Sequence, residues 1–339
     1  VTYGVELFLM LAIGLNVVVG FAGLLDLGYV AFYAVGAYTY ALLASPQLYD
    51  VTHRTLHILV PASNVSPGFH ISMWLILPLA GLMAAVFGIL IGFPTLRLRG
   101  DYLAIVTLGF GEITRIFANN LDDPVNITNG PRGVYDVDPI WVGNYSFGTS
   151  HQIGGFTVPP YLNYYYLVLL MILLTIFLVT RLANSRVGRA WAAIREDELA
   201  AEAGGINTRN LKLLAYASGG FFGGMAGAIF AAGQHFIDPG SFGFFFSILV
   251  LCMVVVGGMG SIPGVILGAV LTGGLYFLTG QFGSYRVLIF GILLVVVIIL
   301  RPAGLLPSGR RKRELEPVEL EEGAIPPLAA SAPETPAAP

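Results

Sequence analysis

Charged residues and cysteines are scarce in this sequence. Charged side chains account for 11% of the 339 residues and hydrophobic ones for 56%, whereas about a quarter of a soluble domain is charged. The single cysteine, Cys252, excludes a disulfide framework and a metal site built from thiolates. Three of the five histidines, His53, His57 and His70, share one polar segment. The composition therefore indicates a membrane protein, and we expect this chain to bind no metal or other cofactor.

Lysine is nearly absent as well. Lys212 and Lys312 are the only two, and neither belongs to a G-x-x-x-x-G-K-[ST] phosphate-binding loop. The sequence also lacks the G-x-S-x-G and H-E-x-x-H motifs of hydrolases. We therefore expect no catalytic residues; if transport uses ATP, another subunit hydrolyses it.

Long apolar runs fill most of the chain. A membrane-spanning helix needs about 20 mainly apolar residues, and nine runs approach this length: Tyr3–Gly23, Leu27–Ser45, Met73–Phe93, Tyr102–Ala118, Tyr161–Leu182, Leu211–Gly233, Phe242–Gly260, Ile262–Thr279 and Tyr285–Leu300. They predict an all-α polytopic membrane protein with about eight or nine transmembrane helices. No basic residue precedes Arg54, so we interpret the first run as a retained span rather than a secretory signal.

Arginine and lysine indicate the orientation, because they favour the cytoplasmic side of a membrane protein. If the segment Asn184–Lys212 is cytoplasmic, alternation of the runs places 13 of the 17 basic residues inside. The N-terminus and two long loops, residues 46–72 and 119–160, then face outward. Residues 1–307 form the predicted transmembrane domain, and the Pro- and Ala-rich residues 308–339 form a predicted disordered cytoplasmic tail.

Glycine and alanine recur every four residues within the spans, as in Gly219–Gly223–Gly227. Small residues let membrane helices approach closely, and we expect this packing role for most of them. The segment Gly257–Gly264 is predicted to interrupt a helix, which membranes tolerate only where the backbone faces protein or water. A V-G-x-x-G pattern occurs at both Val19–Gly23 and Val256–Gly260, which is compatible with an internal duplication.

Few polar side chains interrupt the spans. Glu112 and Arg115 are three residues apart, on one helical face, near the middle of their predicted span. Either they form a structural ion pair, or Glu112 faces a pathway and holds the amino group of a zwitterion. Asn16 is expected to form hydrogen bonds across helices, and Thr107 to bond its own backbone. Asn16, Thr107 and Glu112 are the candidate residues of a transport pathway.

One long polar segment, Asn184–Lys212, lies between the apolar runs. Alanine-rich residues from Trp191 to Ala203 predict a helix, which Gly204 and Gly205 are expected to end. The polar face of this helix is acidic, so anionic lipid of the inner leaflet would repel it. We therefore interpret it as a docking element for a soluble partner; the alternative is an amphipathic helix on the membrane surface.

Several motifs together resemble one transporter family. Ala200-Ala201-x-x-x-Gly205, preceded by Glu198, resembles the EAA motif by which permeases of ATP-binding cassette (ABC) importers contact their ATPases. The glutamate is one residue further from the alanines, and the later Ile-x-Leu-Pro is absent. A more specific resemblance, to the M-type permeases of branched-chain amino acid importers, is carried by Gly14–Gly28, Leu96–Gly109, Asp197–Leu214 and Arg301–Leu306. It covers about Gly14–Pro307.

The resemblance implies the fold of an ABC importer permease with a cytoplasmic coupling helix, in the cytoplasmic (inner) membrane of a prokaryote. The implied partners are a second homologous permease, two cytoplasmic ATPases, an external solute-binding protein, membrane lipid and a branched-chain amino acid, with no role for nucleic acid. The implied ATPase-coupling residues are Asp197, Glu198, Ala200, Ala201 and Gly205. The implied contacts of the binding protein are Asn129, Gly130, Arg132 and Gly133.

Other functions are compatible with the same residues. Urea and short-amide permeases share these motifs, so the substrate stays open within the family. An ATP-independent channel or secondary transporter would use Glu112 as a proton or ion site. A non-transporting membrane scaffold would use the polar helix to bind another protein.

Overall fold

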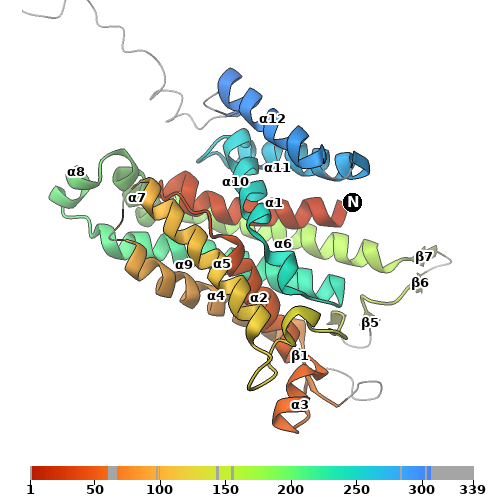
Figure 1. Cartoon of the computed structure of the whole chain (residues 1–339). Coiled ribbons are helices and arrows are strands. Elements are labelled where there is room, and N and C mark those ends of the chain that lie inside the picture. The colour runs from red at the N-terminus through yellow and green to blue at the C-terminus, as the bar shows by residue number, and fades with distance from the viewer. Residues whose placement is uncertain are drawn as a thin grey trace, which may run out of the picture.

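The structure is a computed structural model that describes residues 2–59, 67–96, 98, 100–142, 145–153, 156–282, 285–301 and 304–306. The predicted tail at 308–339 lies outside the described residues, as do Arg97 and Arg99. The described chain is predominantly helical and forms a bundle (Figure 1).

Each of the nine predicted spans contains a helix. The helices are α1 (Thr2–Asn16), α2 (Val30–Leu43), α4 (Met73–Thr95), α5 (Asp101–Asn120), α6 (Pro160–Ala183), α9 (Thr208–Gln234), α10 (Phe244–Gly257), α11 (Ile262–Leu278) and α12 (Tyr285–Leu300). Four described stretches are long and apolar enough to cross a membrane: Gly4–Phe21, Met73–Thr95, Pro160–Ala183 and Thr208–Gln234. Because α2, α10 and α11 are apolar but shorter, the number of membrane crossings stays a prediction.

Two of the apolar runs are interrupted. α1 continues into a π-helical turn, η1 (Val17–Phe21). The junction between α10 and α11 contains Gly258 and Gly260, whose φ angles are 119° and 82°, which confirms the interruption predicted here. The backbone N–H groups of Leu305 and Leu306 donate to the last carbonyls of α10, at 2.9 and 3.0 Å. They satisfy acceptors that a helix end leaves without partners.

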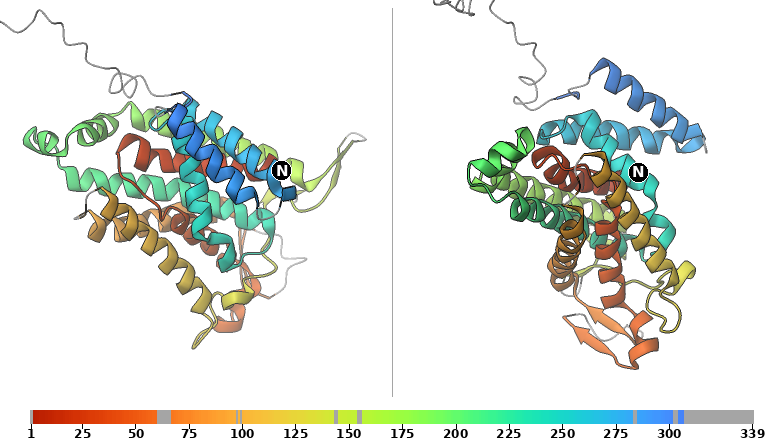
Figure 2. Two further views of the ribbon diagram at one scale, coloured as in Figure 1. Left: turned by 45° about the horizontal axis from the view of Figure 1, so that its top comes forward. Right: turned by 60° about the vertical axis from the view of Figure 1, so that its left-hand side comes forward.

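α9 lies at the centre of the bundle. α4 and α5 lie on one side of α1, α2 and α9, and α11 and α12 lie on the other (Figure 2). Glycines make the contacts of α9 close: a Cβ on Gly227 would lie 2.0 Å from the carbonyl oxygen of Tyr33, and a Cβ on Gly224 would lie 2.6 Å from the carbonyl oxygen of Ala80. The predicted packing role of the small residues is confirmed at these positions.

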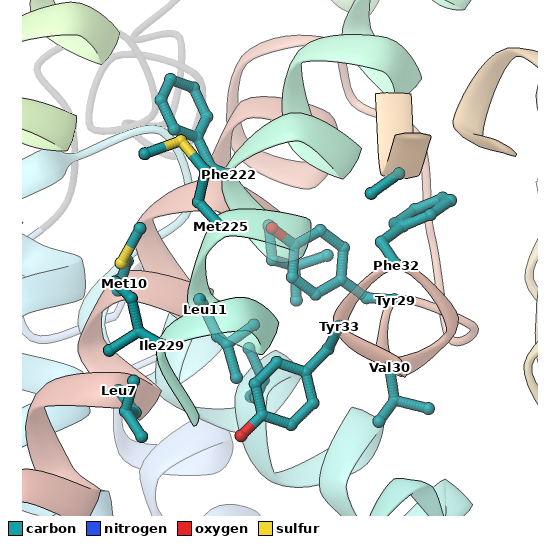
Figure 3. Packing of buried hydrophobic residues seen from close by; sticks show 14 of the residues in the cluster. Leu7, Met10, Leu11, Tyr29, Val30, Phe32, Tyr33, Phe222, Met225 and Ile229 are labelled. Carbon is teal, nitrogen blue, oxygen red and sulfur yellow. The ribbon is translucent and has the colours of Figure 1, made fainter. Parts of the chain in front are cut away.

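The buried core continues between α1, α2 and α9. Figure 3 shows Leu7, Met10 and Leu11 of α1 in one cluster with Met225 and Ile229 of α9. These side chains expose 5% or less of their surface. Apolar packing of this kind holds the three helices together as one unit.

Short strands and turns occupy the connecting segments, so the all-α prediction is incomplete. β1 (Ala44–Ser45) pairs antiparallel with β3 (Phe69–Ile71), and β2 (Leu56–Ile58) pairs parallel with β3. The antiparallel pairs β4–β5 and β6–β7 comprise Trp141–Val142, Tyr145–Ser146, His151–Ile153 and Phe156–Val158. Short helical elements are η2 (Pro46–Leu48), α3 (Tyr49–Thr52), η4 (Gly130–Arg132), η5 (Pro239–Phe242) and η6 (Thr279–Phe282). The strands form because backbone groups in packed loops need partners.

Segments predicted to face the same side of the membrane meet at the same end of the bundle. Val134 and Ile237 form an antiparallel β-bridge, and the N–H of Asp138 donates to the carbonyl of Ala44 at 2.7 Å. All four lie in or beside segments predicted to be external. The two helices of the predicted cytoplasmic segment, α7 (Arg186–Glu196) and α8 (Glu198–Ala203), project from the other end (Figure 1).

Candidate coupling site and transport surface

The predicted cytoplasmic helix consists of two helices. Between α7 and α8, Asp197 has an extended backbone (φ −152°, ψ 112°), and its Oδ1 accepts a hydrogen bond from the N–H of Ala200 at 3.0 Å. Asp197 therefore caps α8, and this bond outweighs the helix propensity of the alanine-rich run. The prediction of one helix from Trp191 to Ala203 is wrong at this point. The predicted stop is confirmed, because α8 ends before Gly205, whose φ is 82°.

Two hydrogen-bonded contacts hold α7 and α8 against the bundle. The buried indole of Trp191 donates from Nε1 to the carbonyl of Leu211 at 2.7 Å. Nζ of Lys212 donates to Oε1 of Glu198 at 2.5 Å, and Lys212 is buried. Ala201 is buried as well. Since Leu211 and Lys212 belong to α9, both short helices are fastened to the start of the central helix.

The opposite side of α8 is open to solvent. Leu199 exposes 63% of its surface, and its exposed neighbours on this side are small or acidic. Of the predicted coupling residues, Glu198 and Ala201 face the bundle. The exposed residues, which we name the α8 face, are Asp197, Leu199, Ala200, Glu202, Ala203, Gly204 and Gly205. Sequence reasoning missed Leu199, because a helix this short has no periodicity that distinguishes its faces.

Arg195 connects α7 to the first span. Its Nη1 donates to the carbonyl of Gly20 in η1 at 2.6 Å, and its aliphatic stem lies against Gly23. Nη1 also lies near Gly260, in the junction between α10 and α11. Nothing in the sequence indicated this role, because the acceptor is a backbone atom 175 residues away.

A pocket of about 180 Å³ lies beside Arg195, and segments far apart in the sequence line it. Leu24 comes from the first of the segments that carry the family resemblance, Leu98 from the second, and Glu198 and Lys212 from the third. Three of those four segments therefore meet at the end of the bundle that bears α7 and α8.

Asn16 and Thr107 are fully enclosed by the chain, at 0% and 1% exposure. Oδ1 of Asn16 accepts from the N–H of Gly260 at 2.9 Å, which confirms the predicted bond across helices. Oγ1 of Thr107 donates to the carbonyl of Ala104 at 3.0 Å and accepts from the N–H of Leu27 at 3.1 Å. The bond to its own helix was predicted, and the bond to Leu27 was not. The part of either residue in a transport pathway stays a prediction.

Glu112 and Arg115 form the predicted ion pair on α5. Nε of Arg115 donates to Oε1 of Glu112 at 2.9 Å, and Nη2 donates to the same oxygen. The side chains are 37% and 34% exposed, so the pair lies on the outer surface of this chain. Ile105 and Phe117, each 62% exposed, flank it on the same helix.

The predicted turn at Asn129–Gly133 is confirmed. Asn129 and Gly130 have φ angles of 59° and 53°, and Nδ2 of Asn129 donates to the carbonyl of Gly133 at 2.9 Å. A Cβ on Gly133 would lie 2.2 Å from the carbonyl oxygen of Ile237, so Gly133 permits the loop to pack on the end of α9. Arg132 is exposed, and it is the charged side chain that this turn presents.

A buried histidine–carboxylate contact also joins the two segments that are predicted to be external. Nδ1 of His70 lies 2.5 Å from Oδ2 of Asp138, and the rings of His57 and His70 are stacked, with centroids 5.2 Å apart. Burial raises the pKa of Asp138, while His70, His57 and His235 oppose that shift. Among the described residues, no group of three or more His, Cys, Asp or Glu side chains is placed to hold a metal ion.

Comparison with known proteins agrees with this architecture. Residues 2–298 match the family described as branched-chain amino acid transport system / permease component. The chain is 42% identical over 324 residues to the high-affinity branched-chain amino acid transport system permease protein LivM of Escherichia coli (strain K12). The alignment covers 91% of this chain and 70% of LivM.

Two more distant relatives extend the comparison. The permease protein LivH of Salmonella typhimurium is 26% identical over 303 residues, 88% of this chain and 91% of LivH. A probable LivM of Methanocaldococcus jannaschii is 26% identical over 334 residues, 89% of this chain and 91% of that protein. No solved structure matches the chain. The helical architecture, the motifs that meet at one end of the bundle and these matches show that the chain belongs to the family of permease components of branched-chain amino acid transport systems.

Proposed function

We propose that this chain is the permease subunit of an ABC importer that moves branched-chain amino acids inward across the cytoplasmic membrane of a prokaryote. Two separate ATPase subunits bind ATP and Mg²⁺, a second homologous permease completes the pore, and an external binding protein delivers the substrate. The similarity to both LivM and LivH supports a pair of permeases.

The observation that carries the proposal is the construction of α7 and α8. One side is fastened to α9 through Trp191 and the Glu198–Lys212 ion pair. The other side, the α8 face, presents Leu199 among small and acidic residues. A rigid projection with an exposed apolar residue suits docking to a soluble ATPase, because force applied there reaches the bundle without being lost in a flexible loop.

The ion pair on α5 supports a proposal about where the transport pathway lies. A charged pair that is one-third exposed on a membrane helix is costly against lipid. We therefore propose that this face of α5 meets the second permease and that Glu112 lies beside the path of the zwitterionic substrate. Arg132 at the external end offers a charge for contact with the binding protein.

Reconstitution into liposomes tests the proposal. The chain is assembled with its candidate permease partner and ATPases, and labelled leucine, isoleucine or valine is supplied with candidate binding proteins. We expect uptake that requires both ATP and a loaded binding protein. Uptake that follows an ion gradient without the ATPases would establish a secondary transporter instead, and preference for urea or a short amide would change the substrate.

A further inference from the structure

Two interrupted helices touch each other at the end of the bundle that bears α7. The N–H of Gly260, in the junction between α10 and α11, donates to Oδ1 of Asn16 at 2.9 Å. A Cβ on Gly20, in the π-helical turn, would lie 2.0 Å from that oxygen and 2.5 Å from the nitrogen of Gly260. π-Helical turns often occur at functional sites, and a broken helix can change its geometry more easily than a continuous one. Two deformable points of the backbone therefore lie in direct contact.

Arg195 joins α7 to both of these points. Its Nη1 donates to the carbonyl of Gly20, which lies where the first span ends and where carbonyls carry partial negative charge without a helical donor. A Cβ on Gly260 would lie 3.2 Å from Nη1, and a Cβ on Gly23 would lie 2.8 Å from Cγ of Arg195. The guanidinium and the aliphatic stem of Arg195 therefore occupy space that is open because Gly260 and Gly23 have no side chain.

The other two contacts of α7 and α8 reach α9 rather than the first span. Trp191 is hydrogen-bonded to Leu211, and Glu198 is paired with Lys212, so both contacts reach α9. The bond from Arg195 leads instead to the first span. A movement of α7 thus has one route into α9 and another, through Arg195, into the two interrupted helices.

We propose that Arg195 is a positioning residue that carries the displacement of α7 and α8 to the first span and to the junction between α10 and α11. The inference rests on the proposed function, because the displacement comes from the ATPases. It adds the residue through which that displacement reaches the deformable backbone. The Arg195–Gly20 bond, the Asn16–Gly260 bond and the contact of Arg195 with Gly260 together form the link.

The test compares Arg195→Ala, Arg195→Lys and wild type in the reconstituted transporter, and it measures amino acid taken up per ATP hydrolysed. Loss of one hydrogen bond from a charged donor predicts that Arg195→Ala lowers this ratio about tenfold. Arg195→Lys restores part of it, because lysine keeps one donor. Arg189→Ala is the matched control: Arg189 lies on the same helix, is exposed, and its Nη1 donates only locally, to the carbonyl of Asn184.

A second measurement does not depend on uptake. Spin labels are placed at the exposed positions Leu306, packed on the end of α10, and Leu90 on α4. We expect ATP to change the distance between them in wild type and in Arg189→Ala, but not in Arg195→Ala with its ATPases still bound. If Arg195→Ala does not assemble, Arg195→Gln is compared in the same way.

The outcomes separate the inference from the proposed function. A wild-type ratio and a wild-type label movement in Arg195→Ala would overturn the role of Arg195 and leave the importer function intact. Absence of ATP-dependent uptake in the wild type would refute the importer function itself.

Discussion

The ammonium group of Lys212 lies 2.5 Å from the carboxylate of Glu198, so an ion pair holds α8 against α9. Lys212 is buried, whereas Glu198 is partly exposed. We expect Glu198→Ala to leave the ammonium without its acceptor and to lower the free energy of unfolding by about 1–3 kcal/mol. Thermal unfolding of the purified permease measures this change. The exposed Glu202→Ala is the control, and an equal loss in both variants would contradict the importance of the pair.

Leu199 is predicted to be an anchor of the ATPase contact. Because its side chain is 63% exposed, Leu199→Glu should leave the fold and membrane insertion unchanged but should reduce co-purification of the ATPases at least about tenfold, as for a central interface residue. Leu199→Met, which keeps an apolar side chain, is the control. Full retention of the ATPases by Leu199→Glu would place the docking surface elsewhere.

Gly20 is predicted to tolerate no side chain. Its Cβ position lies 2.0 Å from Oδ1 of Asn16, so Gly20→Ala should displace Asn16 from Gly260 and destabilise the permease by about 1–3 kcal/mol. Gly274 on α11 is the matched control, because no atom that its Cβ would meet lies within 4 Å. Differential scanning fluorimetry should show a lower melting temperature for Gly20→Ala only. Equal effects of the two substitutions would mean that this contact adjusts freely.

Substitution of both residues of the ion pair on α5 distinguishes a role in the transport pathway from a purely structural role. We expect Glu112→Gln with Arg115→Gln to keep the second permease bound, since no unpaired charge remains, and to lower the maximal uptake rate several-fold. The amount of partner permease that co-purifies and the rate of uptake are measured on the same preparation. Unchanged uptake would show that the pair serves the structure alone.

The burial of Asp138 predicts that the stability of the protein depends on pH. Burial raises the folded-state pKa of Asp138 above its ordinary value of about 4. Its contribution to stability is therefore fully present below about pH 4 and is lost as the pH rises through the raised pKa. Asp138→Asn removes this titration, so its melting temperature should fall less than that of wild type between about pH 4 and pH 7. Parallel curves for the two proteins would show that Asp138 does not contribute.

Much of the fold was predictable, because membrane helices follow from local composition. Length and hydropathy alone predicted the runs that contain α4 and α6. The interruption between α10 and α11 was predicted from clustered glycine and proline. The turn at Asn129–Gly133 followed from residues that favour positive φ. The division between α7 and α8 did not follow, because the capping bond of Asp197 competes with helix propensity, and a short sequence does not indicate which prevails.

The sequence predicted which segment carries the candidate site, but it did not predict which residues of that segment are exposed. The motif around Ala200 and Gly205 predicted the segment that we propose contacts an ATPase. The assignment of Leu199 to the outside and of Glu198 and Ala201 to the inside depended on how α8 packs on α9.

The sequence by itself determined the membrane class, the helical runs, the distribution of basic residues and the family, since each depends on residue types and their local spacing. Only the tertiary structure decided which polar groups meet: Arg195 with Gly20, Asn16 with Gly260, and Lys212 with Glu198. The first two pairs join positions more than 150 residues apart, and in both the partner is a backbone group. Backbone groups are the same in every residue type except proline, so a residue pattern cannot identify them, and the packing of the helices selects them.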